Sequence, residues 1–507
     1  MSAKFVAVLM LCSIHSAAIA APVQSEGDKL VGTGAVGTAN QATAIAVSGD
    51  GSTVIVGGAR DDSDAGAAWV YTRGGGVSSQ QGNKLVGTGA VGHASQGSSV
   101  ALSLDGNTAI VGGVFDNAGA GAAWVFTRSN GVWSQQGSKL VGSGAFGNAS
   151  QGCSVALSAD GNTAIVGGSF DNFSKGAAWV FTRIAGQWGQ QGPKLVGTGA
   201  VGNASQGVSV SLSADGNTAL VGGFTDNGGT GAAWVFTRSG NVWTQQGSKL
   251  VGTGAVSNAN EGRSVALSAD GNTAIVGGDN DNSQVGASWV FTRNGAVWSQ
   301  QGNKLVGTGA QGNASQGASV SLSGDGSTAI VGGPSDNGSA GATWVYTRRL
   351  GVWSQQGNKL VGDGAAGSAS QGASVSLSVD GNTAIVGGPS DGGGAGAAWV
   401  FVSSAAVGVE PSSPPAVIDF APVAPNPALS VATLRFSLAH SARFSLAIFN
   451  PAGRRIREVT SGVASEGEHA FTWDLRDDSG RAAGAGVYFA RLEVEGRVVT
   501  RMLVALN

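Results

Sequence analysis

Short runs of apolar residues alternate with glycine-rich polar segments along most of the chain, without the 3.6-residue period of a helix. Within residues 99–142, the segments SVALSLD, TAIVGG, AAWVFTR and VWSQQGSKLVG each fit a short strand. Asp-Gly-Asn forms a tight turn after the first of them, and DNAGAG (116–121) is expected to be a loop. The pattern predicts four short strands and no helix in each such stretch.

This four-strand unit recurs with a constant spacing of 55 residues. The Trp of the third strand recurs at Trp69, Trp124, Trp179, Trp234, Trp289, Trp344 and Trp399. The Lys of the fourth strand recurs at Lys29, Lys84, Lys139, Lys194, Lys249, Lys304 and Lys359. Repeats of roughly this length are typical of solenoids, propellers and arrays, and four-stranded units are typical of β-propeller blades.

The two ends of the repeat region are complementary. A fourth strand, VQSEGDKLVG (23–32), comes before any first strand, and the last repeat breaks off after its third strand at Phe401. The N-terminal strand is therefore expected to complete the last unit and close a ring. The fold class predicted is all-β, a seven-bladed β-propeller over residues 21–402, with a β-solenoid as the alternative.

Two sets of Trp side chains recur in the repeats. The seven third-strand Trp are expected in the core between neighbouring blades, the alternative being a ring of stacking platforms for sugars. A second set begins the fourth strands and is expected to be half exposed, with a ligand role as the alternative: Trp133, Trp188, Trp243, Trp298 and Trp353.

The repeat QGxSVALSADGNTAIVGGxxDNxxxGAAWVFTR, over residues 29–402, resembles bacterial FG-GAP repeats and the blades of the integrin α-subunit propeller. The resemblance implies a seven-bladed propeller and extracellular binding or adhesion. Calcium-binding blades of this family carry several Asp or Asn ligands in a long loop between the first two strands. Here that connection is a tight turn with one carboxylate, such as Asp105, so the turn is expected to be structural and no metal or other cofactor is predicted.

Beyond the repeats the composition changes. Residues 403–419 are rich in Pro, Ser and Ala and are expected to form a linker, and residues 420–507 contain short alternating strands typical of an Ig-like β-sandwich. The features NPAG (450–453) and GVYF (486–489) resemble the Ig-like domain of flagellar hook-capping proteins and the C-terminal sorting domains of type IX secretion. That resemblance implies a Gram-negative envelope or cell-surface destination, with the secretion machinery as a partner.

The N-terminus has the pattern of a secretory signal peptide over residues 1–20. Lys4 precedes a short apolar core, and Ala18-Ile19-Ala20 gives a cleavage site near Ala20. Cys12 raises lipidation as an alternative, although the residues before it fit a lipobox poorly. The protein is therefore expected to be secreted or held at the cell surface, and no later apolar run is long enough to span a bilayer.

Charge and composition exclude several classes of function. Charged residues make up 12% of the chain and its net charge is −3, which argues against a nucleic-acid partner. Few His follow the signal, and no Ser/His/Asp set, Cys/His cluster or zinc spacing is present. The sequence therefore does not predict an enzyme, and a polysaccharide hydrolase or lyase is the least favoured hypothesis.

Recurring polar residues outside the strands are the candidate ligand contacts. One set lies between the second and third strands: Asp61, Asp116, Asp171, Asp226, Asp281, Asp336 and Asp391. Another lies in the long loop before the first strand: Asn148, Asn203, Asn258 and Asn313. In a propeller both loops lie on one face, so they are predicted to bind a protein or polysaccharide there. The alternatives are Asp residues that only bond their own turns, and a structural envelope or matrix protein with no dedicated ligand.

Overall fold

The computed structural model describes residues 23–403, 419–421, 423–426, 428–438, 441–450, 454–465, 467–494 and 497–506. The chain divides into two compact units, residues 1–407 and residues 408–507, here called the larger and the smaller unit. The predicted signal peptide (1–20) and residues 404–418 of the predicted linker lie outside the described residues.

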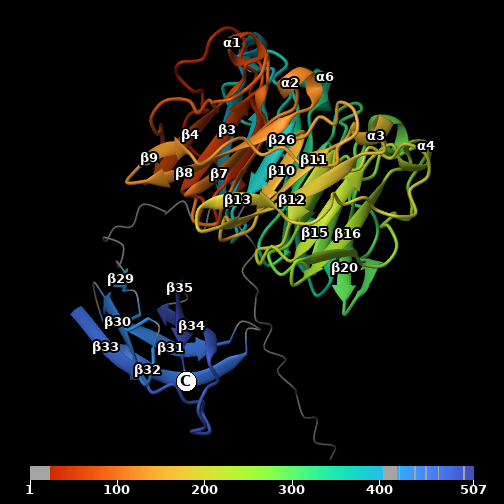
Figure 1. Ribbon diagram of the computed structural model, residues 1–507. Coiled ribbons are helices and arrows are strands. Elements are labelled where there is room, and N and C mark those ends of the chain that lie inside the picture. Colours follow the sequence, from red (N-terminus) through yellow and green to blue (C-terminus); the bar gives the residue numbers. More distant parts are fainter. Residues whose placement is uncertain are drawn as a thin grey trace, which may run out of the picture. The chain divides into compact units, whose positions relative to one another are not determined.

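The larger unit consists of seven four-stranded antiparallel sheets, as the 55-residue repeat predicts (Figure 1). Six sheets follow the order of the sequence, as in β6-β7-β8-β9, and the last has the order β26-β27-β28-β1. The first strands are β2 (Gln41–Val47), β6 (Gln96–Leu102), β10 (Ser154–Leu157), β14 (Ser209–Leu212), β18 (Ser264–Leu267), β22 (Ser319–Leu322) and β26 (Ser374–Leu377). The second strands are β3 (Thr53–Gly58), β7 (Thr108–Gly113), β11 (Thr163–Gly168), β15 (Thr218–Gly223), β19 (Thr273–Gly278), β23 (Thr328–Gly333) and β27 (Thr383–Gly388).

The outer half of each sheet has a long and a short strand. The third strands are β4 (Ala67–Gly74), β8 (Ala122–Ser129), β12 (Ala177–Ile184), β16 (Ala232–Ser239), β20 (Ala287–Asn294), β24 (Ala342–Arg349) and β28 (Ala397–Ser403). The fourth strands are β5 (Val77–Gln80), β9 (Val132–Gln135), β13 (Gln187–Gln190), β17 (Val242–Gln245), β21 (Val297–Gln300), β25 (Val352–Gln355) and β1 (Val23–Ser25). The fourth strands are shorter than the sequence pattern predicts, because the KL segment of each repeat makes only an isolated bridge to the third strand.

A single turn of helix joins the second strand of each sheet to the third, where the sequence pattern predicts a plain loop. These turns are α1 (Asp61–Asp64), α2 (Asp116–Gly119), α3 (Asp171–Ser174), α4 (Asp226–Gly229), α5 (Asp281–Gln284), α6 (Asp336–Ser339) and α7 (Asp391–Gly394). Their two central residues have left-handed dihedral angles, as at Asn117 with φ 51° and Ala118 with φ 56°. A 3.6-residue hydrophobic period cannot reveal such a segment, because it is too short to repeat.

The hydrophobic core of the larger unit lies between sheets rather than within them. Ile110 and Val125 of one sheet pack with Val166 and Trp179 of the next. Six more clusters of this kind exist, and one of them joins Ile385 of the last sheet to residues of the first. The seven third-strand Trp are at most 2% exposed, which confirms their predicted place in the core.

Contacts between sheets run in a cycle. The backbone N–H of Gly49 donates to the carbonyl of Leu104 in the next sheet at 2.9 Å, and the equivalent bond recurs from sheet to sheet until Val379 donates to Gly49 at 3.0 Å. Strand β1 pairs antiparallel with β28, so the N-terminal segment supplies the fourth strand of the last sheet, as predicted. The Glu26 carboxylate beside β1 also pairs with Arg73 of the first sheet.

All seven first strands line two shared cavities, of about 240 and about 160 Å³. The larger cavity is lined by Val155, Val210 and their equivalents near the start of the strands. The smaller one is lined by Leu102, Leu157 and their equivalents at the other end. The seven first strands therefore lie close to one another, although they belong to seven different sheets.

The smaller unit has two antiparallel sheets that share one core. One sheet has the order β29-β30-β33 and the other β32-β31-β34-β35. The strands are β29 (Asp419–Phe420), β30 (Ala432–Leu438), β31 (Ala442–Phe449), β32 (Arg455–Ala464), β33 (Gly467–Trp473), β34 (Gly486–Val494) and β35 (Arg497–Ala505). Phe436 and Trp473 of the first sheet pack in one cluster with Leu446 and Leu492 of the second, which gives the predicted β-sandwich. No helix in the described parts of either unit is long and apolar enough to cross a membrane.

Candidate ligand-binding face

The turns α1 to α7 and the long loops before the first strands lie together, and we call this surface the loop face. Figure 1 shows the labelled turns α1 to α4 and α6 along one border of the larger unit. The turn of one sheet meets the long loop of the next, since a Cβ added to Gly119 would lie 3.5 Å from Cβ of Asn148. The long loops are residues 33–40, 88–95, 143–150, 198–205, 253–260, 308–315 and 363–370.

Each turn begins with a buried Asp that holds two other segments in place. In the second sheet, Oδ2 of Asp116 accepts from Nζ of Lys139 at 2.5 Å, and Oδ1 accepts from the backbone N–H of Val91 at 2.7 Å. The same two bonds recur in every sheet, with Lys29 serving Asp391. The ion pairs are Lys84–Asp61, Lys139–Asp116, Lys194–Asp171, Lys249–Asp226, Lys304–Asp281, Lys359–Asp336 and Lys29–Asp391.

The placement of these seven Asp gives no support to the prediction that they contact a ligand. The side chain of Asp116 is 1% exposed, and both carboxylate oxygens already accept from protein donors. Burying a carboxylate without hydrogen-bond donors costs free energy. The Lys ammonium and the backbone N–H offset this cost and so stabilise the buried Asp. The Asp residues therefore organise the loop face rather than form its surface.

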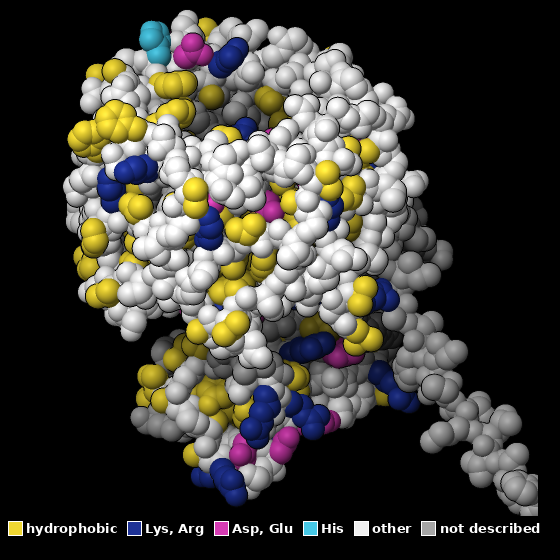
Figure 2. Space-filling view, turned by 90° about the vertical axis from the view of Figure 1, so that its right-hand side faces the viewer, with side chains coloured by type: hydrophobic (Ala, Val, Ile, Leu, Met, Phe, Trp, Pro, Cys, Tyr) yellow, Lys and Arg dark blue, Asp and Glu magenta, His cyan; other side chains and the backbone are white. Residues whose placement is uncertain are grey.

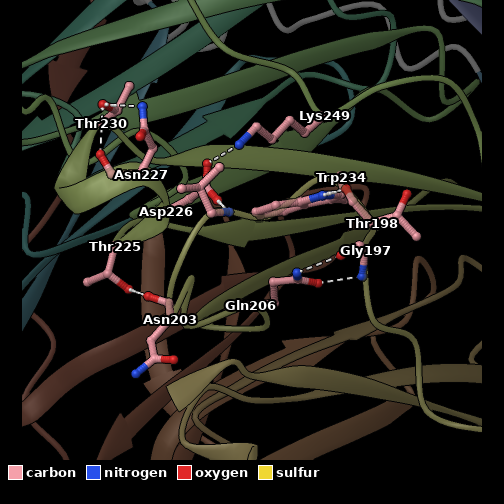
Figure 3. A network of polar contacts seen from close by, with 11 residues as sticks. Gly197, Thr198, Asn203, Gln206, Thr225, Asp226, Asn227, Thr230, Trp234 and Lys249 are labelled. Carbon is pink, nitrogen blue, oxygen red and sulfur yellow. Dashed lines mark hydrogen bonds and ion pairs between the residues drawn. The ribbon is translucent and has the colours of Figure 1, made fainter. Parts of the chain in front are cut away.

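A second polar contact joins the two ends of each long loop. In the fourth sheet, Oε1 of Gln206 accepts from the N–H of Gly197 at 2.5 Å, and Nε2 donates to the carbonyl of Gly197 at 3.0 Å (Figure 3). The indole N–H of Trp234 donates to the carbonyl of Thr198 at 2.8 Å. These bonds fix the path of the loop as it leaves the core.

The fifth sheet departs from this arrangement because Glu261 stands where the other sheets have Gln. One Glu261 oxygen accepts from the N–H of Gly252 at 2.6 Å, and the other has no hydrogen-bond partner among the described residues. Burial, together with the charge of Asp281, raises the pKa of Glu261 to about 8. The protonated carboxyl can donate to the Gly252 carbonyl, as the Gln amide does elsewhere.

The four predicted Asn side chains, Asn148, Asn203, Asn258 and Asn313, are exposed on the loop face. Their backbones take part in loop packing, since Thr225 Oγ1 donates to the carbonyl of Asn203 at 2.7 Å. Ligand binding through these Asn stays a prediction.

A cavity of about 790 Å³ lies on the loop face between the first two sheets. Its lining includes Arg60, Asp64, His93 and Phe115. None of these residue types recurs through all the repeats: Arg60 stands where the fourth sheet has Thr225, for example. The recurring positions of the repeat do not predict this site, because its lining residues are not among them. The signal that would have found it was the set of positions where one repeat differs from the others.

The half-buried Trp of the fourth strands belong to contacts between sheets. The indole N–H of Trp133 donates to Oε1 of Gln81 in the preceding sheet at 2.9 Å, and the guanidinium of Arg128 lies 5.3 Å from the Trp133 ring centre. In the first sheet Ser78 stands at the position of the Trp. Its strand neighbour Arg73 pairs with the Glu26 carboxylate, where the equivalent Arg of the second sheet contacts a Trp ring. The Asp turns between the first two strands are structural as predicted, since Ser103 and Asn107 both donate to Asp105.

Among the described residues, no group of three His, Cys, Asp or Glu side chains is placed to hold a metal ion. Figure 2 shows that most of the visible surface of the larger unit is neither charged nor hydrophobic. A surface of this kind suits recognition through shape and hydrogen bonds.

Comparison with known families finds one match. Residues 429–496, within the smaller unit, match the FlgD Ig-like domain family. The match and the shared core of the two sheets agree on an Ig-like fold for this unit. A comparison with curated proteins finds no match to the chain.

Proposed function

We propose that the larger unit is a closed seven-bladed β-propeller of the FG-GAP type that binds an extracellular protein or polysaccharide through its loop face. The cycle of backbone hydrogen bonds from Gly49 to Val379 and the pairing of β1 with β28 support the closed ring. The shared axial cavities support the same arrangement.

The observation that carries the binding role is the cavity of about 790 Å³ between the first two sheets. Concave sites with a few convergent polar groups are where proteins commonly bind ligands. Arg60 and His93 supply hydrogen-bond donors and Phe115 an apolar surface, and all three are departures from the repeat.

We further propose that the protein acts outside the cell or at its surface. The pattern of residues 1–20 supports export, and the FlgD Ig-like match supports an envelope or surface role for the smaller unit. On this proposal the smaller unit directs or anchors the chain, and the larger unit is the part displayed.

The test measures ligand binding to the immobilised full chain by biolayer interferometry. The ligands are a panel of soluble polysaccharides and the proteins found in the culture medium of the cells that produce this chain. A double variant replaces Arg60→Ser and His93→Asn, which are residues that the repeat carries at Ser335 and Asn148. We expect at least one ligand to bind the wild type and to lose at least tenfold in affinity in the variant.

The matched control changes exposed side chains away from the loop face, Val242→Ala and Val297→Ala on the fourth strands β17 and β21. Its binding should equal that of the wild type. If no component of the panel binds, or if every ligand ignores the Arg60 and His93 changes, the structural-protein alternative replaces this proposal.

A further inference from the structure

Four exposed Phe side chains gather on the loop face of the second and third sheets. Their exposed fractions are 59% for Phe115, 57% for Phe146, 59% for Phe170 and 75% for Phe173. In the described part of the chain they are the only exposed Phe, Tyr or Trp side chains. Because exposed aromatic surface is costly in water, its restriction to two neighbouring sheets indicates a partner.

These Phe stand at positions where most of the other repeats have a different residue. The fourth sheet has Val201, Thr225 and Gly228 at the positions of Phe146, Phe170 and Phe173. Phe115 and Phe170 occupy equivalent positions on consecutive sheets, and Arg60 occupies that position on the sheet before them. The three side chains are therefore spaced at regular intervals along the ring.

The protein holds the Phe in place without a ligand. The N–H of Phe146 donates to Oδ1 of the buried Asp171 at 2.8 Å, and the N–H of Asn172 donates to the carbonyl of Phe146 at 3.0 Å. The rings of Phe146 and Phe173 lie 5.5 Å apart. Phe173 has φ 57°, a left-handed conformation that is rare for a bulky residue, so the turn carries strain to present this side chain.

Two cationic side chains flank the aromatic ones. Arg60 precedes Phe115 along the ring, and Lys175 directly follows the turn that carries Phe173. Both are exposed, and within the described residues neither forms an ion pair. Lys175 also departs from the repeat, which has Thr230 in the fourth sheet. Asp62 and Asp64, exposed in the turn that follows Arg60, offset its charge, so Lys175 beside the apolar rings is the stronger complement to a ligand that has both carboxylates and apolar faces.

We propose that these residues bind an acidic polysaccharide, with the C–H faces of successive sugar rings on the Phe side chains and sugar carboxylates at the two cations. We call them the aromatic arc, and its members are Arg60, Phe115, Phe146, Phe170, Phe173 and Lys175. A polymer fits because Phe115 and Phe170 occupy equivalent positions on two consecutive sheets, so one chain can contact several weak sites at once. This inference rests on the proposed binding role of the loop face and names the ligand class of that role.

The experiment measures binding of three probes to the full chain by isothermal titration calorimetry. Polygalacturonate has both sugar rings and carboxylates, dextran has rings without charge, and poly-L-glutamate has carboxylates without rings. We expect polygalacturonate to bind at least tenfold more tightly than either of the others, with an affinity that falls as salt is added.

Two variants test the residues. The first carries Phe115→Thr, Phe146→Val, Phe170→Thr and Phe173→Gly, which copies the fourth sheet and so keeps a sequence that the fold already contains. The second carries Arg60→Ser and Lys175→Thr. We expect each to lose at least tenfold in polygalacturonate affinity, with melting temperatures unchanged or raised. The Val242→Ala and Val297→Ala variant should bind as the wild type does.

Several outcomes would overturn the inference. Equal binding of poly-L-glutamate would reduce the site to simple charge attraction, and unchanged binding in the Phe variant would place the polysaccharide elsewhere. Failure of polygalacturonate to bind, while another ligand depends on Arg60 and His93, would reject the acidic polysaccharide and leave the proposed function standing.

Discussion

Nζ of Lys29 lies 2.6 Å from Oδ2 of Asp391, although the two residues are 362 positions apart. The same contact joins Lys139 to Asp116 at 2.5 Å over 23 positions. The junction between the last sheet and the N-terminal segment thus repeats the contact made inside every other sheet.

We predict that Lys29→Met destabilises the larger unit by about 2–4 kcal/mol, because it leaves the buried Asp391 carboxylate without its cation. Unfolding in urea, followed by Trp fluorescence, measures the loss. The matched control is Lys194→Met, which removes the equivalent partner of Asp171 inside the third sheet. If Lys194→Met lowers the free energy of unfolding and Lys29→Met leaves it at the wild-type value, β1 does not contribute to the stability of the larger unit.

We predict that Glu261→Gln stabilises the protein in a pH-dependent way. The pKa of Glu261 is about 8 in the folded protein, above its ordinary value of 4.5, so the folded state binds the extra proton between these values. The stability of the wild type therefore falls as pH rises from 4.5 to 8. The gain from Gln should be small at pH 4 and on the order of 4 kcal/mol at pH 8.

The measurement is the urea midpoint of the wild type and of Glu261→Gln across that pH range. The reverse change, Gln206→Glu, should place a second such carboxyl in the fourth sheet, because Gln206 bonds both the N–H and the carbonyl of Gly197. The stability of that variant should therefore fall more steeply than that of the wild type as pH rises. Parallel pH profiles for the wild type and Glu261→Gln would contradict this account of Glu261.

We predict different costs for the two classes of Trp. Trp234→Ala should lower the free energy of unfolding by about 3–5 kcal/mol, because Trp234 is fully buried between two sheets. Trp243→Ala should cost about 1–2 kcal/mol, because Trp243 is half exposed and loses mainly its bond to Gln191. Equal losses would show that the outer Trp carry as much of the core as the inner ones.

We predict that the two units unfold independently. A chain ending at Ser403 should keep the melting temperature of the larger unit, because every core cluster of that unit is complete without the smaller one. The core of the smaller unit likewise contains only residues from 420 onward. Calorimetry should show two transitions for the full chain and one for the shortened chain, and a large shift of the remaining transition would show that the units stabilise each other.

The sequence predicts the seven four-stranded sheets of the larger unit because the 55-residue period marks each of their strands, and Trp69 with its equivalents marks their core. It fails to predict the environment of Asp61, for a physical reason. Lys84 and Asp61 recur with the same period as every other repeated residue, so the spacing alone cannot show that they form an ion pair. Arg60 and Phe173 were missed for the opposite reason, since they break the period and so fall outside a search for recurring residues.

The pairing of β1 with β28 also sets an order of events during folding. Ribosomes and export channels deliver a chain from its N-terminus, so the strand that emerges among the first is the one whose partner emerges last. Until Ser403 is free, β28 has no neighbour on its outer side and β1 has none at all. The last sheet is thus completed by a contact between distant parts of the chain, which loop-closure entropy makes slow.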